Sequence, residues 1–154
     1  MDIGFYLLDI TAENQQQDIF IKSINEFCEL NPYYNIVLFN NQFAKIDNKK
    51  YYTLHIQQAK YFTGLLFIFD VRSAMLTQTF PSPKKQILYM SDAEWSNKPA
   101  VPYGFWENIY MRDNIEIITD NKDTYNLCEI CWKQPLYLLE SISGKEFNNV
   151  INKL

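Results

Sequence analysis

Five consecutive apolar residues at 65–69, which read LLFIF, place the strongest constraint on what this chain can fold into. A strand with one face in water alternates apolar and polar residues, so a run without any polar residue indicates a strand that is covered on both faces. Such strands occur in parallel sheets that carry helices on either side. The run therefore predicts an α/β fold.

Segments with strand and helix patterns alternate along the rest of the chain. The predicted strands are residues 3–8, 36–39, 51–56, 65–69, 87–90, 115–119 and 136–139. The predicted helices are residues 12–30, a short helix that ends with a left-handed Gly64, residues 71–80, 103–111 and 121–132, and a final helix near the C-terminus. This order predicts a mostly parallel sheet with right-handed crossovers. We therefore predict a single Rossmann-like α/β domain over residues 1–154, built as a three-layer sandwich.

Two of these helices show an apolar face at helical spacing. In the first helix, the apolar residues on one side are Ile19, Phe20, Ile24, Phe27, Cys28 and Leu30. In the final helix, they are Phe147, Val150, Ile151 and Leu154. A face of this kind is expected to pack on the core.

Charge and hydrophobicity exclude several functional classes. A net charge of −4 argues against a dedicated nucleic-acid binder, which needs a basic surface. No apolar run is long enough to span a bilayer, and the first residues, Met1-Asp2-Ile3, carry no basic region before a hydrophobic stretch. We therefore predict a cytoplasmic protein without a membrane span. The three cysteines, an odd number, fit a reducing compartment.

An acidic residue follows most of the predicted strands. These residues are Asp9, Asp70, Asp92, Asp120 and Glu140. The carboxyl ends of parallel strands share one edge of the sheet, and ligands bind at that edge in open α/β folds. The acids can form a carboxylate cluster for Mg²⁺ or a general base, or they can cap the helices that follow. Both interpretations stay open, and capping explains Asp92 least because no obvious helix follows it.

The segment from Tyr89 to Asp120 joins two predicted strands through an unusually long connection. Loops of this length are usually functional or disordered. Disorder is not expected here, because Trp95, Trp106 and their apolar neighbours supply too much hydrophobic area to leave in water. We expect an ordered cover over the carboxyl edge, in which residues 95–110 either close the core or contact a second chain.

Several common motifs are absent or weak. The four glycines form neither a dinucleotide-binding sequence nor a P-loop, so no cofactor is predicted. Cys128 and Cys131 have C-x-x-C spacing, but no further ligands lie nearby, so they indicate core packing rather than a metal site. His55 is expected at a partly exposed edge position. Arg72 follows the LLFIF strand and either reaches an anionic ligand or pairs with Asp70.

The order of elements in the second half resembles the N-terminal domain of GT-B-type glycosyltransferases. The segments that carry this resemblance are LLFIF, ILYMSDAEW, IEIITDN and PLYLLES. In that family the N-terminal domain receives the acceptor through loops at its carboxyl edge, whereas the nucleotide-sugar site lies mainly in a second Rossmann-like domain. The resemblance therefore implies a GT-B half-domain that binds a sugar or another polar acceptor and needs a partner subunit for transfer.

Two main hypotheses of function follow. In the first, the chain binds a sugar or nucleotide-sugar ligand at the carboxyl edge, where Asp92 or Glu94 takes the acceptor proton and Trp95 stacks on the sugar ring. The side chains expected to line this site are Asp9, Asp70, Arg72, Asp92, Glu94, Trp95 and Asp120. In the second, the chain is a non-catalytic module that contacts another copy or a partner through residues 95–110. A Mg²⁺-dependent phosphotransfer or hydrolase site is a third reading, but its usual lysine and hydroxyl companions are missing.

Overall fold

The computed structural model describes residues 1–8, 15–41, 50–97 and 100–154, and these residues form one seven-stranded parallel sheet. Its strands are β1 (Asp2–Tyr6), β2 (Asn35–Asn40), β3 (Tyr52–His55), β4 (Leu65–Ile68), β5 (Lys85–Tyr89), β6 (Ile115–Thr119) and β7 (Tyr137–Leu138). They lie in the order β3-β2-β1-β4-β5-β6-β7, and every neighbouring pair is parallel. The predicted α/β fold with a parallel sheet is confirmed.

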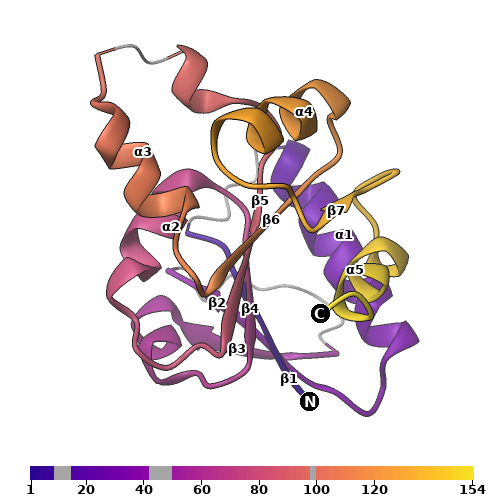
Figure 1. Ribbon diagram of the computed structural model, residues 1–154. Helices are drawn as coiled ribbons and strands as arrows, with labels where there is room; N and C mark the ends of the chain where they lie inside the picture. The colour runs from indigo at the N-terminus through magenta and orange to yellow at the C-terminus, as the bar shows by residue number, and fades with distance from the viewer. Residues whose placement is uncertain (9–14, 42–49, 98–99) are drawn as a thin grey trace.

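Helices cover both faces of the sheet, and they connect each pair of consecutive strands except β2 and β3, whose connection lies largely outside the described residues (Figure 1). The α-helices are α1 (Gln15–Leu30), α2 (Val71–Leu76), α3 (Tyr103–Tyr110), α4 (Lys122–Cys131) and α5 (Gly144–Ile151). The 3₁₀ helices are η1 (Ile56–Tyr61), η2 (Thr77–Thr79) and η3 (Glu94–Asn97). The predicted helix over residues 71–80 is therefore an α-helix followed by a 3₁₀ turn, and Ile56 starts η1 instead of ending β3.

Two hydrophobic cores lie on opposite faces of the sheet. One is formed with α1 and α5, through residues such as Phe20, Phe27 and Phe147. The other is formed with η1, α2, α3 and α4, through residues such as Trp106 and Tyr110. Figure 1 shows α1 and α5 on one side of the sheet and α2 and α3 on the other. The three-layer Rossmann-like sandwich is thus confirmed.

The sequence overestimates how much of each amphipathic helix is buried. Ile19 and Leu30 were expected on the packed face of α1, but both are exposed. The stripe that meets the sheet is narrower and runs through Phe20, Ile24 and Phe27. Leu154 is also exposed, because α5 ends at Ile151 and the last residues lie beyond the packed helix.

Gly64 does not have the left-handed conformation predicted from the sequence. The short helix η1 ends at Tyr61, and Gly64 instead lies directly before β4. A Cβ atom at this position would come within 2.1 Å of the carbonyl oxygen of Asp2. The glycine is therefore needed for the close approach of two backbones rather than for an unusual backbone angle.

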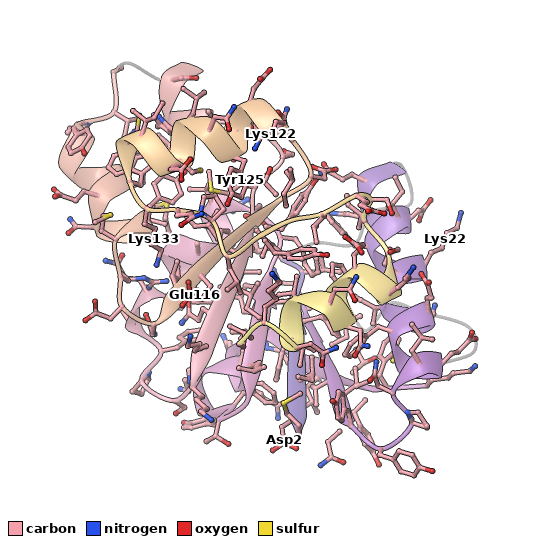
Figure 2. All side chains as sticks on the ribbon, turned by 45° about the vertical axis from the view of Figure 1, so that its right-hand side comes forward. Asp2, Lys22, Glu116, Lys122, Tyr125 and Lys133 are labelled. Carbon is pink, nitrogen blue, oxygen red and sulfur yellow. The ribbon has the colours of Figure 1, made fainter. Side chains whose placement is uncertain are left out.

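The two ends of the sheet lie at opposite ends of the molecule. Figure 2 shows Asp2, at the start of β1, at one end and Lys122, at the start of α4, at the other. On one side of β1 lie β2 and then β3. On the other side lie β4, β5, β6 and β7 in chain order. The topology therefore switches direction between β1 and β4, and in such sheets ligands bind beyond the carboxyl ends of the strands at this point.

Candidate functional site

A cleft lies at this switch point, beyond the carboxyl ends of β1, β4 and β5. It consists of two adjoining pockets of about 230 Å³ and about 130 Å³. Gln16 at the start of α1 and Phe69 and Asp70 after β4 line both pockets. Because these pockets share three lining residues, we describe them together as the switch-point cleft.

Asp70 caps α2. Its side chain accepts hydrogen bonds from the backbone N–H of Ser73, at 2.7 Å, and from the Ser73 hydroxyl, at 2.6 Å. These bonds satisfy an N–H group that the helix itself leaves unpaired. The capping interpretation therefore holds at this position, and both carboxylate oxygens of Asp70 already have a partner.

Replacing Asp70 by serine is expected to leave the free energy of unfolding nearly unchanged, because serine is an equally good N-cap. Alanine at the same position is expected to cost about 1 kcal/mol, since it leaves the Ser73 N–H without its partner. Urea denaturation of both variants measures the difference. Equal stabilities for the serine and alanine variants would show that the cap contributes little.

Arg72 is exposed on the first turn of α2 and lines the larger pocket. Within the described residues the ion pairs are Lys50–Glu29 and Lys85–Glu116, so the expected pairing of Arg72 with Asp70 is not observed. Ser73 occupies the carboxylate of Asp70 instead. The guanidinium is therefore at the rim of the cleft, where it can donate to a ligand.

Asp92 and Glu94 follow β5 and line the smaller pocket. Asp92 is exposed and makes no hydrogen bond or ion pair to any residue that the structure describes. The nearest following helix, η3, begins at Glu94, so Asp92 does not cap it. Among the described acids that follow the strands, the carboxylates of Asp92 and Glu140 have no partner in the fold, and of these two only Asp92 lines the cleft.

Asp120 does not line the cleft itself but contacts Tyr89, which does. The Tyr89 hydroxyl donates a hydrogen bond of 2.9 Å to Oδ1 of Asp120, and Tyr89 itself lines the smaller pocket. Burial, together with the bond to Asp120, raises the pKa of Tyr89 above its ordinary value, so the hydroxyl keeps its proton. Asp120 does not cap α4, because Asn121 accepts from the N–H groups of that helix instead.

Four polar residues that line this cleft were not anticipated from the sequence, namely Gln16, Gln17, Tyr89 and Ser91. Gln16 lies on the first turn of a helix whose start could not be placed to within a residue from its pattern. Tyr89 reads as an ordinary strand residue, and only its position at the end of β5 distinguishes it. Asp9, which was expected in the site, lies outside the described residues.

Trp95 packs into the core on the α3 side. Its ring meets the rings of Tyr110 and Trp132 edge to face, at centroid distances of 5.3 Å and 5.8 Å. It lines neither pocket of the switch-point cleft. The side chain is half-buried, and its observed role is to close the second core. Trp95 therefore lies outside the switch-point cleft, and its stacking on a sugar ring stays a prediction.

The long segment between β5 and β6 is an ordered part of the fold where it is described. Its helix α3 turns Trp106, Ile109 and Tyr110 into the second core, where all three are buried. Exposed apolar side chains remain at Tyr103 and Met111. A contact with a second chain therefore stays a prediction, and it cannot use Trp106 unless the fold opens.

Cys128, Cys131 and His55 all contribute to packing or to local hydrogen bonding in the fold. Cys128 is buried and Cys131 half-buried against the second core, and burial raises the pKa of the Cys128 thiol to about 12. Leu127, in the same helix α4, is exposed. His55 is half-buried at the end of the edge strand β3, where its Nδ1 accepts from the N–H of Gln57 at 3.3 Å.

Metal ligands and membrane helices were also sought among the described residues. No group of three His, Cys, Asp or Glu side chains there is arranged to hold a metal ion. None of the helices in this part of the chain is both long and apolar enough to cross a membrane.

Comparison with known proteins found no match among protein-family models, curated proteins or solved structures. The resemblance to GT-B glycosyltransferases therefore rests on the order of the elements alone. What can be argued about function has to come from the switch-point cleft.

Proposed function

We propose that the protein binds a small uncharged sugar, or a similar polyhydroxylated molecule, in the switch-point cleft. The observation that carries this proposal is the position of the cleft at the point where the sheet reverses its order, with Asp92, Glu94 and Arg72 along its walls. Carboxylates accept hydrogen bonds and a guanidinium donates them, so together they match hydroxyl groups, which do both.

Size and charge both favour a sugar over a nucleotide. The two pockets, of about 230 Å³ and about 130 Å³, are each smaller than a typical small-molecule site. Among the described lining residues the acidic side chains outnumber the arginine, which disfavours a phosphate group. A glycine-rich loop for a diphosphate is also missing from the sequence. A nucleotide-sugar donor is therefore expected to require a second domain.

The proposal includes a chemical role at this site. Asp92 is available to take the proton of an acceptor hydroxyl, because no other described residue holds its carboxylate, and Glu94 lines the same pocket. The relation to the acceptor half of GT-B glycosyltransferases is part of this proposal and is supported by the order of the elements. On this view the chain acts as an acceptor-binding half and a partner subunit supplies the donor.

The experiment is a thermal-melting series with glucose, galactose, mannose and N-acetylglucosamine. Ligands that bind only the folded state raise the melting temperature with concentration. We expect at least one sugar to raise it for the wild type, and Asp92→Asn to abolish that shift. Asp113→Asn is the matched control, since Asp113 is also an exposed aspartate but lines neither pocket of the cleft.

Two results would contradict the proposal. One is the absence of any shift with the four sugars. The other is a shift that Asp92→Asn leaves unchanged, which would place the ligand elsewhere. UDP-glucose gives a further comparison, because it is expected to shift the melting temperature no more than glucose does if the donor site is absent from this chain.

A further inference from the structure

A second cavity, of about 460 Å³, lies on the other face of the sheet. It is a depression that is open to solvent, and it lies between η1 on one side and the end of α2 and η2 on the other, over the end of β1. Its lining residues are Tyr6, Ile56, Gln57, Lys60, Leu76 and Phe80. None of these residues lines the switch-point cleft, so the two sites share no described lining residue.

The walls of this cavity are aromatic and aliphatic. The rings of Tyr6 and Phe80 meet at a centroid distance of 6.2 Å and an angle of 69°, which leaves aromatic surface toward the cavity. Ile56 is buried beneath, while Leu76 is 48% exposed beside it. Apolar walls with a few polar groups are typical of small-molecule sites, and the volume lies within their usual range.

Tyr6 provides an unpaired polar group in this cavity. The residue as a whole is only 2% exposed, and its hydroxyl makes no hydrogen bond to a described residue. The hydroxyl oxygen is not among the buried polar atoms that lack a partner, so it lies where water or a ligand can reach it. Burial, with a smaller contribution from Asp70, raises the pKa of Tyr6 to about 12, so the hydroxyl is protonated at neutral pH and can donate.

The other polar side chains in the lining also donate hydrogen bonds. Lys60 carries the one charge of the six lining residues, and Gln57 has an amide that donates from its nitrogen. None of the described residues that line the cavity has a carboxylate. The carboxylate of Asp70, which is near enough to Tyr6 to affect its pKa, is bound by Ser73. The cavity therefore favours a ligand that accepts hydrogen bonds and carries one negative charge.

We propose that this cavity binds a small aromatic monocarboxylate. The aromatic ring packs against Phe80 and Tyr6, and the carboxylate accepts hydrogen bonds from the Tyr6 hydroxyl and from Gln57 or Lys60. A single ammonium group suits one negative charge better than the two of a phosphate. This site does not depend on the function proposed for the switch-point cleft.

Calorimetric titration with 4-phenylbutyrate tests the proposal, with 4-phenylbutanol as the uncharged probe of similar shape. The Lys60 ammonium lies 4.8 Å from the centroid of the exposed Tyr61 ring and can move from there to a bound anion. We expect saturable binding of the carboxylate at one site per chain and binding at least tenfold weaker for the alcohol, because the alcohol has no negative charge to attract this ammonium. Absence of saturable binding up to the solubility limit would overturn the proposal. Equal affinity for the two probes would overturn the assignment of a carboxylate.

Three variants locate the site. Tyr6→Phe keeps the ring and removes the hydroxyl, and it is expected to weaken binding of 4-phenylbutyrate about tenfold. Leu76→Glu places a negative charge at the rim and is expected to abolish binding. Met75→Glu is the matched control, since Met75 is the adjacent residue of α2, is 40% exposed and does not line the cavity.

The fold of each variant is checked from its thermal melting curve before titration. Leu76 and Met75 are both well exposed, so either glutamate is expected to leave the fold intact. Equal loss of binding in Leu76→Glu and Met75→Glu, or unchanged binding in Tyr6→Phe, would show that 4-phenylbutyrate binds outside this cavity and would contradict the proposal.

Discussion

Replacing Gly144 by alanine is expected to destabilise the protein by about 3 kcal/mol. A Cβ atom on Gly144 would come within 2.3 Å of the backbone nitrogen of Phe27 and within 2.7 Å of the carbonyl carbon of Glu26. These are atoms of the α1 backbone, so no side chain can rotate away to make room. The first residue of α5 therefore has to be a glycine for the two helices to pack on the first core.

The same substitution also threatens a hydrogen bond. The N–H of Gly144 donates to Oε2 of Glu26 at 2.8 Å, which ties the start of α5 to α1. Any shift of α5 that relieves the contact with Phe27 also lengthens this bond. The cost of the shift therefore adds to the steric cost.

Gly104→Ala is the control for this prediction. Gly104 lies within α3, and a Cβ atom there would meet nothing within 4 Å. Alanine has the higher helix propensity, so this variant is expected to be more stable by about 0.5–1 kcal/mol. Urea denaturation measures both variants. Equal effects at the two positions, or a tolerated Gly144→Ala, would contradict the close packing of α1 and α5.

The second large effect is expected for Phe5→Ala, with a loss of about 3–5 kcal/mol. Phe5 lies at the centre of the first core and is fully buried. Its ring contacts four others, those of Phe27, Phe67, Phe69 and Phe147, at centroid distances from 5.2 to 6.2 Å. These neighbours come from both sheet and helices, so they cannot collapse together to fill the space.

Tyr33→Ala is the matched aromatic deletion at the surface. Tyr33 is 93% exposed, and its removal is expected to change the free energy of unfolding by less than about 0.5 kcal/mol. Denaturant titration of both variants under the same conditions gives the comparison. A loss below about 1 kcal/mol for Phe5→Ala would contradict the description of this aromatic cluster as the centre of the core.

The sheet could be predicted because the amino-acid composition of its strands indicates how deeply they are buried. The stretch at 65–69 has no polar residue to expose, and the acids that follow the strands mark one edge. Burial on both faces requires helices on both sides, so the layered fold follows from the sequence alone. The spacing of strand and helix patterns then supplies the parallel direction.

The details of the cleft could not be predicted because they depend on single residues at the ends of elements. Asp70 is an N-cap, whereas at β6 the cap falls one position later, on Asn121, and leaves Asp120 to bond Tyr89. Sequence patterns locate such ends only to within a residue or two. An error of one residue in the start of a helix therefore decides whether a carboxylate is predicted to cap that helix or to be available to a ligand.

The orientation of Trp95 depends on contacts that are distant in the sequence. Its ring packs against Trp132, which follows α4, and against Tyr110 in α3. Nothing in the loop that contains Trp95 indicates whether the ring turns toward the cleft or toward these partners. The sequence supplies the apolar area of the segment, but the face it covers is set by tertiary packing.

The most direct test of the central claim is a nuclear magnetic resonance titration of the isotopically labelled protein with the sugar that raises its melting temperature most. The account predicts that backbone amide shifts concentrate around the switch-point cleft, at Gln16, Asp70, Arg72, Asp92 and Glu94. Shifts that are absent, or that concentrate at the opposite end of the sheet near Asp2, would contradict it.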